Sequence, residues 1–208
     1  MISSSNRSRH AFWLKHLHRW HWISAAICLV GMLMFAITGI TLNNAGHIEA
    51  KPQVREAAAR LPNALLPLLA AEPASDKTQL PPDILRWITD AFGVDAVGRA
   101  IEWSKDEVYI SLPRPGGDAW LSIQRDGGEA IYEVTDRGWV SYFNDLHKGR
   151  NTGAAWGWFL DVFAMACLIF AITGLVLLHL HARHRAATWP LVGLGLVAPL
   201  LLAVLFIH

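Results

Sequence analysis

Residues Trp22 to Leu42 read WISAAICLVGMLMFAITGITL, a run without a charged residue that is long enough to cross a bilayer as a helix. Two similar runs extend from about Trp156 to Leu180 and from about Pro190 to Ile207. Hydrophobic residues make up 53% of the 208-residue chain, which is high for a soluble domain of this length. The sequence therefore predicts a membrane α-helical protein with three transmembrane helices.

Basic residues predict the orientation of these helices. Four basic residues and no acidic one lie from Arg7 to Arg19, and Arg183 and Arg185 lie in the short loop between the second and third runs. Both flanks are therefore expected in the cytoplasm. The first run is too long for a signal-peptide core and no clear cleavage site follows it, which favours an uncleaved anchor. We expect a multi-pass membrane protein with a cytoplasmic amino terminus and a carboxy terminus on the opposite side, which in a bacterium is the periplasm.

The chain is accordingly divided into four expected segments. Residues 1–43 hold the cytoplasmic amino terminus and the first helix, and residues 44–150 form a periplasmic module with its connectors. Residues 151–182 form the second helix, and residues 183–208 hold a cytoplasmic loop and the third helix.

The sequence of the periplasmic segment predicts a small α+β module. Residues 51–76 indicate a connector, with a short helix expected at Val54 to Leu61. Asp83 is expected to cap a helix that ends near Gly93. Alternating apolar runs then predict strands of an antiparallel sheet at residues 99–103, 108–112, 119–124 and 130–134. This part of the sequence has no histidine, no cysteine and no phosphate-type glycine loop, so we expect no active site within it.

The histidines gather at the ends of the predicted helices, and none of the ten lies between residues 48 and 146. Imidazole is a usual ligand of haem iron and transition metals, and helix bundles build such sites from facing helices. The candidate cofactor-binding histidines are His18, His21, His47, His147, His179, His181 and His208. Among them, the candidates for direct metal ligation are His18, His47, His147 and His181.

The pentapeptide FAITG occurs in both of the first two helices, at Phe35 to Gly39 and at Phe170 to Gly174. Because these helices are expected to run in opposite directions, the motif forms an inverted repeat. Thr38 and Thr173 can return their hydroxyls to the backbone or donate across the helix pair, and the glycines allow close approach of helices or of a flat ligand. Packing of small residues alone is the alternative explanation.

Antiparallel packing predicts which histidines meet. His47 is expected to meet His147 at the outer face, and His18 and His21 are expected to meet His179 and His181 at the inner face. Residues that are level on antiparallel helices have numbers with a nearly constant sum, and the sums for His47 with His147 and for His18 with His179 are 194 and 197. At about 100° per residue, His18 and His47 lie within about 20° of each other on the first helix. His147 and His179 lie within about 40° if one unbroken helix carries both.

Asp161 stands in otherwise apolar sequence about one turn after Trp158. A carboxylate is costly in lipid, so we expect this side chain to face the helix bundle and to act at the cofactor site. Lys148 and Arg150 are its candidate partners, and an ion pair that only fixes the depth of the helix is the alternative.

Several stretches resemble the PepSY-associated transmembrane proteins of bacterial inner membranes: LHRWHWISAA, FAITGITLNN, DLHKGRNTGAAWGWFLDVF, ITGLVLLHLHA and TWPLVGLG. The resemblance covers nearly the whole chain and is most specific in the helices. It implies that the module is PepSY-like, and larger relatives include haem-containing siderophore reductases.

The resemblance also implies roles for individual residues. His18, His21, His147 and His181 match the family pattern, as do Asp161 and both Thr-Gly pairs. One departure is that the family tends to have histidine where this chain has Asn44, with His47 three residues later. His208 is therefore a rival partner for His147.

Three functions remain open from the sequence. The first is a b-type haem protein, with one or two haems, that transfers electrons across the membrane for reduction of ferric iron or a ferric siderophore. As an enzyme it would be a haem-dependent ferric-siderophore reductase. The second is a non-catalytic PepSY protein that binds or regulates a periplasmic partner. The third, transition-metal transport or sensing, lacks a polar path in the Leu-rich third helix.

The expected partners follow from these hypotheses. They are the lipid bilayer, a periplasmic ferric siderophore or protein, a cytoplasmic electron donor and, to enclose a cofactor, a second copy of the chain in a homodimer. No nucleic acid is expected.

Overall fold

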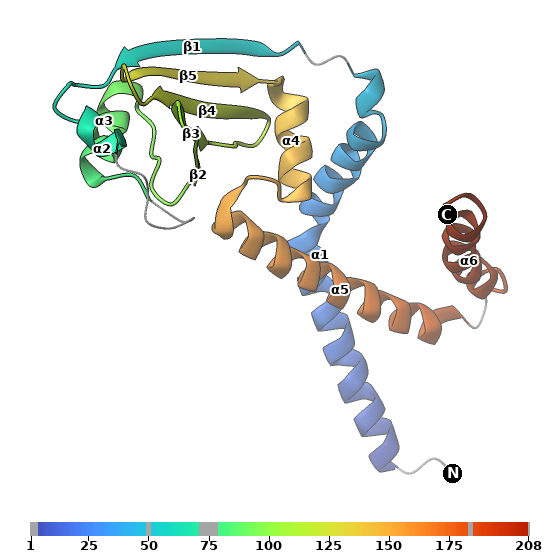
Figure 1. The fold of residues 1–208 in the computed structure, drawn as a ribbon. Helices are drawn as coiled ribbons and strands as arrows, with labels where there is room; N and C mark the ends of the chain where they lie inside the picture. The colour runs from blue at the N-terminus through green and yellow to red at the C-terminus, as the bar shows by residue number, and fades with distance from the viewer. Residues whose placement is uncertain (1–3, 49–50, 71–78, 183–184, 208) are drawn as a thin grey trace. The chain divides into compact units, whose positions relative to one another are not determined.

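The computed structural model describes residues 4–48, 51–70, 79–182 and 185–207 (Figure 1). The chain forms two compact units. The helical unit comprises Met1–Leu33 and Phe159–His208, and the module unit comprises Met34–Trp158. Helices α1 (Ser4–Asn43) and α5 (Gly153–His181) each contribute to both units.

Three helices are long and apolar enough to cross a membrane, as the sequence predicted. They are Ala11–Asn43 within α1, Gly153–His181, which is α5, and Thr188–Phe206, which is α6. Very few of their side chains are buried inside the protein, as expected for helices whose surroundings are lipid. The chain is therefore a multi-pass membrane protein.

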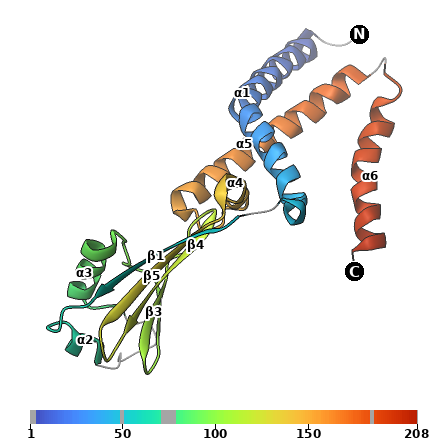
Figure 2. The same ribbon diagram turned by 90° about the horizontal axis from the view of Figure 1, so that it is seen from above.

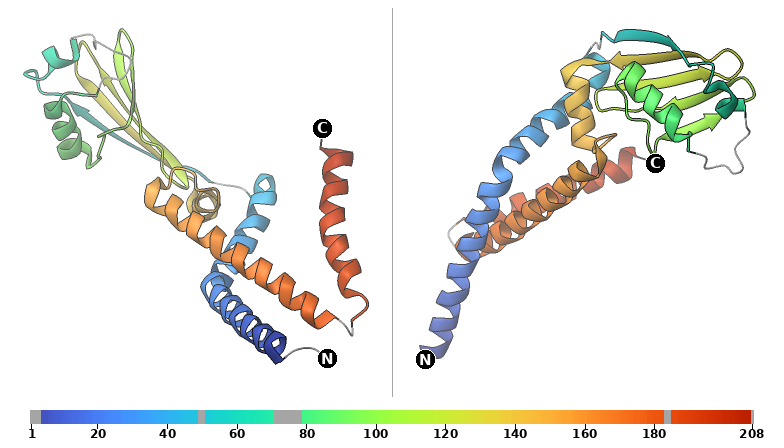
Figure 3. Two further views of the ribbon diagram at one scale, coloured as in Figure 1. Left: turned by 90° about the horizontal axis from the view of Figure 1, so that it is seen from below. Right: turned by 90° about the vertical axis from the view of Figure 1, so that its left-hand side faces the viewer.

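In the helical unit, α1 and α5 cross each other (Figures 2 and 3). Small residues lie where they cross. A methyl group at Gly31 would overlap the Phe163 ring, so glycine is required for this approach. Cys28 is fully buried and its thiol neighbours that of Cys167, so both cysteines pack as small side chains between α1 and α5.

The module unit contains a five-stranded antiparallel sheet with the order β1-β5-β4-β3-β2 (Figure 1). Its strands are β1 (Gln53–Arg60), β2 (Ala100–Trp103), β3 (Glu107–Ser111), β4 (Gly117–Gln124) and β5 (Glu129–Asp136). The last four confirm the strands expected from alternating apolar residues.

Helix α3 (Pro82–Phe92) supplies the core of the module together with the sheet. Ile84 and Ile88 are fully buried against strand residues such as Leu121. The helix ends where expected, because Gly93 adopts a left-handed conformation at its carboxy end. The expected capping role of Asp83 was wrong: Pro81 occupies the N-cap, and Asp83 lies in the first turn without capping the helix.

The short helix expected at Val54 to Leu61 was also wrong, because this segment forms strand β1. The run of alanines favours a helix locally, but every residue from Gln53 to Arg60 pairs with a residue of β5. Tertiary pairing therefore overrides local propensity here. The short helix α2 (Leu66–Ala70) follows β1 instead.

Neither His47 nor His147 lies within α1 or α5. Helix α4 (Gly138–Lys148) carries His147 and ends at Gly149, whose φ of 64° is left-handed, and α5 begins separately at Gly153. Helix α1 ends at Asn43, and His47 lies in the separate 3-10 turn η1 (Ala45–His47). The rotational comparisons that placed His47 and His147 on continuous helices therefore do not apply.

Candidate functional site

In the helical unit, the second FAITG copy forms a cradle around His21. The Nδ1 atom of this α1 histidine lies 3.0 Å from Thr173 Oγ1 on α5, and its ring stacks on Phe170 with centroids 4.8 Å apart and planes at 14°. A Cβ atom at Gly174 would lie only 3.1 Å from His21 Cε1. Phenylalanine, threonine and glycine of the motif therefore each contact or make room for the imidazole. We call this group the His21 cradle.

In the module unit, the first FAITG copy forms the matching His147 cradle. The histidine comes from α4, and its Nδ1 atom lies 2.6 Å from Thr38 Oγ1 on α1. Its ring packs against Phe35 with centroids 4.7 Å apart, and a Cβ atom at Gly39 would lie 3.9 Å from its Cε1. Each copy of the pentapeptide therefore packs around the side chain of one histidine of the chain, one copy in each unit.

The hydrogen bonds in the cradles assign a tautomer to each histidine. Each threonine hydroxyl donates its hydrogen to a backbone carbonyl one turn back, Thr38 to Met34 at 2.9 Å and Thr173 to Ile169 at 2.7 Å. The hydroxyl oxygen is then the acceptor for the ring, so a neutral histidine carries its proton on Nδ1. The Nε2 lone pair is left available to an external ligand.

His18 and His181 reach the same tautomer by another route. The Nδ1 atom of each lies near the carbonyl four residues earlier, Leu14 at 2.9 Å and Leu177 at 2.8 Å. A carbonyl only accepts, so Nδ1–H is the donor and Nε2 is free. The two rings face each other edge to plane, with centroids 6.1 Å apart. The structure thus brings His18 to His181, which is one of the two histidines that it was expected to meet.

The remaining candidate histidines are placed differently. The ring of His179 packs on Trp189 at the start of α6, with centroids 5.5 Å apart. His47 is exposed in η1, whereas the described contacts of His147 go to the FAITG residues, so their pairing stays a prediction. His208 lies outside the described residues.

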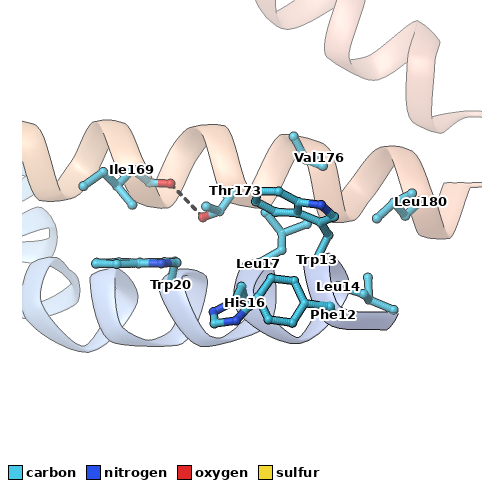
Figure 4. A pocket seen from close by; sticks show the side chains of 10 residues that line it. All are labelled: Phe12, Trp13, Leu14, His16, Leu17, Trp20, Ile169, Thr173, Val176 and Leu180. Atoms are coloured by element: carbon cyan, nitrogen blue, oxygen red, sulfur yellow. Dashed lines mark hydrogen bonds between the residues drawn. The ribbon is translucent and has the colours of Figure 1, made fainter. Parts of the chain in front are cut away.

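A groove of about 600 Å³ runs between α1 and α5 beside the His21 cradle (Figure 4). Its walls are mostly apolar and include the rings of Phe12, Trp13 and Trp20, with Thr173 contributed by α5. Figure 4 shows the Thr173 hydroxyl bonded to the Ile169 carbonyl at the edge of this groove. The groove therefore provides a large apolar space next to the His21 cradle.

Asp161 lies on an exposed face of α5, although we expected it to face the helix bundle. Its position follows from helix geometry, because the neighbouring buried residues Phe163 and Ala166 turn the opposite side of α5 toward the protein. Asp161 is therefore no part of either histidine cradle.

Sequence reasoning found Thr38 and Thr173 but missed Phe35 and Phe170 as ring partners of the histidines. The signal was present, because phenylalanine stands at the same position of both motif copies. It was missed because phenylalanine is also common on the lipid-facing side of a membrane helix, where it has no specific partner.

The spans, the inserted α+β module and the paired cradles define a class of helical membrane protein with histidines held between its helices. The model of the PepSY_TM-like family matches residues 12–208, and the chain belongs to this family. No curated protein and no solved structure matches the chain significantly.

Proposed function

We propose that this chain is a b-type haem protein that carries electrons through the bacterial inner membrane toward ferric iron or a ferric siderophore in the periplasm. One observation carries the proposal: His18, His21, His147 and His181 each hold Nδ1 in a hydrogen bond and leave Nε2 available. A ligating histidine usually has this arrangement, in which a fixed Nδ1–H orients the ring and Nε2 binds the metal.

The donor set fits haem better than a bare metal ion. Within the described ranges, no three or more His, Cys, Asp or Glu side chains come together, whereas an ion held by protein alone needs several ligands. Haem brings its own equatorial ligands, so one or two imidazoles suffice. His18 and His181, whose ring centroids lie 6.1 Å apart, would be candidates to hold it together.

Bound haem would supply reversible one-electron chemistry. The residues of the chain would position it: the cradle threonines hold the imidazoles in one orientation, and the apolar groove beside Thr173 keeps water away. The excess of basic residues in the amino-terminal part of α1, from Arg7 to Arg19, supports a cytoplasmic amino terminus and a periplasmic carboxy terminus. Electrons would then enter from a cytoplasmic donor.

Liposomes test this function. The purified protein, with or without added haem, is reconstituted around a trapped reductant, and a ferric chelate with a ferrous-specific dye is added outside. Haem-loaded protein should reduce the external chelate well above the leak rate of the haem-free protein, and His21→Ala should return it to that rate. Equal rates with and without haem would reject electron transfer and favour a binding role for the module.

A further inference from the structure

Helix α4 is hydrogen-bonded to the ends of two membrane-spanning helices, α1 and α5. Within the module unit, Thr38 Oγ1 bonds His147 Nδ1, and the Thr41 hydroxyl donates to Asn144 Oδ1, both at 2.6 Å. These two contacts have the same sum of residue numbers, as in antiparallel helices packed in register. The indole N–H of Trp156, in the first turns of α5, also donates to a carbonyl near the end of α4 at 2.9 Å.

This register gives the depth of the rest of α4. Continued residue by residue, it places Phe143 level with Leu42 and Trp139 level with Gly46. The first span ends at Asn43. At 1.5 Å per residue, both aromatic residues lie within about 5 Å of the end of the span along its axis. The uncharged apolar run of this helix, Trp22 to Leu42, ends here, so a bilayer is expected to pass from acyl chains to headgroups at this depth.

The polarity of α4 is reversed relative to a helix that faces water. Its polar residues Asn144 and Asp145 are buried, and the Asp145 carboxylate accepts a backbone N–H at 2.9 Å. Its apolar residues Trp139, Val140 and Phe143 are 76%, 41% and 39% exposed. A helix in water has the opposite distribution, so the exposed face is suited to a non-aqueous neighbour.

The exposed face is also aromatic. The rings of Trp139, Tyr142 and Phe143 contact one another with centroids 5.7–6.2 Å apart. Tryptophan and tyrosine are enriched where membrane proteins meet the headgroup region, because their rings are apolar and their edges are polar.

We infer that α4 is a membrane-interface helix. Its face of Trp139, Val140 and Phe143 lies in the bilayer boundary on the side that carries the module, and the pocket beside this face takes a phospholipid headgroup. The hydrogen bonds of α4 to both membrane-spanning helices favour lipid as the neighbour of its exposed face. They hold this face at the depth of the bilayer boundary, where lipid surrounds the helices. The inference does not depend on haem binding.

The pocket has the chemistry of a headgroup site. It encloses about 350 Å³ and is lined by Arg114, Asp136, Trp139 and Tyr142 among others. Arg114 and Asp136 lie 3.6 Å apart and are about half exposed, so both charges remain accessible. The guanidinium suits a phosphate, and the carboxylate with the aromatic rings suits an ammonium group. A zwitterionic headgroup such as that of phosphatidylethanolamine satisfies both.

Spin-label accessibility tests the placement. In the full chain with Cys28→Ala and Cys167→Ala, nitroxides are attached at Trp139→Cys and Phe143→Cys, with Asp90→Cys on the exposed surface of α3 as control. The protein is placed in phosphatidylethanolamine–phosphatidylglycerol nanodiscs. Labels at positions 139 and 143 should collide several-fold more with oxygen than with a water-soluble nickel complex, and the control should show the reverse.

Two results would overturn the inference. Nickel accessibility at positions 139 and 143 equal to the control would place the face in water, and protection from both reagents would place it against protein. A second measurement keeps the native cysteines and tryptophans: 5-fluorotryptophan is incorporated, and Trp139→Phe identifies the Trp139 resonance. Lipid carrying a nitroxide on its headgroup should broaden that resonance, and an unbroadened signal would reject the headgroup site.

Discussion

Replacing Thr173 by valine tests the His21 cradle by removing one hydroxyl while nearly keeping the shape of the side chain. Thr173 is only 9% exposed, and its Oγ1 is the acceptor 3.0 Å from His21 Nδ1. Without that acceptor the partly buried N–H of His21 loses its partner, which costs at most about 1–3 kcal/mol. Loss of the group that orients a ligating histidine weakens metal binding by about 10–100-fold.

Two assays follow this change. Haem titration should show the weakening in Thr173→Val, whereas Thr173→Ser, which keeps the hydroxyl, should stay close to wild type. Nitrogen-15 NMR of labelled histidine should show His21 leaving the fixed Nδ1–H tautomer in the valine variant, with or without haem. Thr89→Val is the matched control, since the Thr89 hydroxyl bonds backbone carbonyls on the module surface. Equal loss in the valine and serine variants, or no change in either, would refute the role of the hydroxyl.

The remaining predictions concern the motif glycines, alkaline stability and the module core. Gly174→Ala should crowd the histidine ring 3.1 Å away and lower haem affinity, whereas Gly39→Ala, with 3.9 Å available, should be tolerated; haem titration compares them. Burial, followed by the charge of Asp118, raises the pKa of Tyr109 above its ordinary 10.0. The neutral phenol therefore keeps its full contribution to folding stability below pH 10, and this contribution is lost as the pH rises through the raised pKa. The melting temperature of Tyr109→Phe should accordingly fall less at alkaline pH than that of the wild type. Ile88→Ala should destabilise the module by about 2–5 kcal/mol and lower its urea midpoint.

The membrane spans and most of the sheet were predictable because their signals are local. A long apolar run specifies a span without reference to any partner, and strands β2 to β5 show the alternation of a sheet with one buried face. The end of α3 was equally local, because Gly93 supplies the left-handed residue that closes a helix.

Strand β1 and the break between α4 and α5 were not predictable in this way. The alanines of β1 have no alternation, and the strand exists because β5 offers an edge along its whole length. Gly149 and Gly153 are compatible with either an unbroken membrane helix or a turn, and only their φ values of 64° and 78° distinguish the two.

The residues of the two cradles could be named from the sequence more readily than their pairing. The helix-end histidines and the motif threonines were identified from the sequence, but His147 reaches Thr38 only because α4 is a separate helix that runs back along α1. A count of residues along continuous helices could not reveal that contact.

The visible absorption spectrum of detergent-purified protein, before and after dithionite, tests the central claim most directly. Protein produced with ample haem should show the Soret band and the sharp reduced bands of low-spin haem with histidine ligands. His21→Ala and His147→Ala should each shift or remove part of that spectrum while the protein still inserts into the membrane. A wild-type protein without haem absorption, or a spectrum that neither variant changes, would contradict the assignment of the cradles as haem-ligating sites.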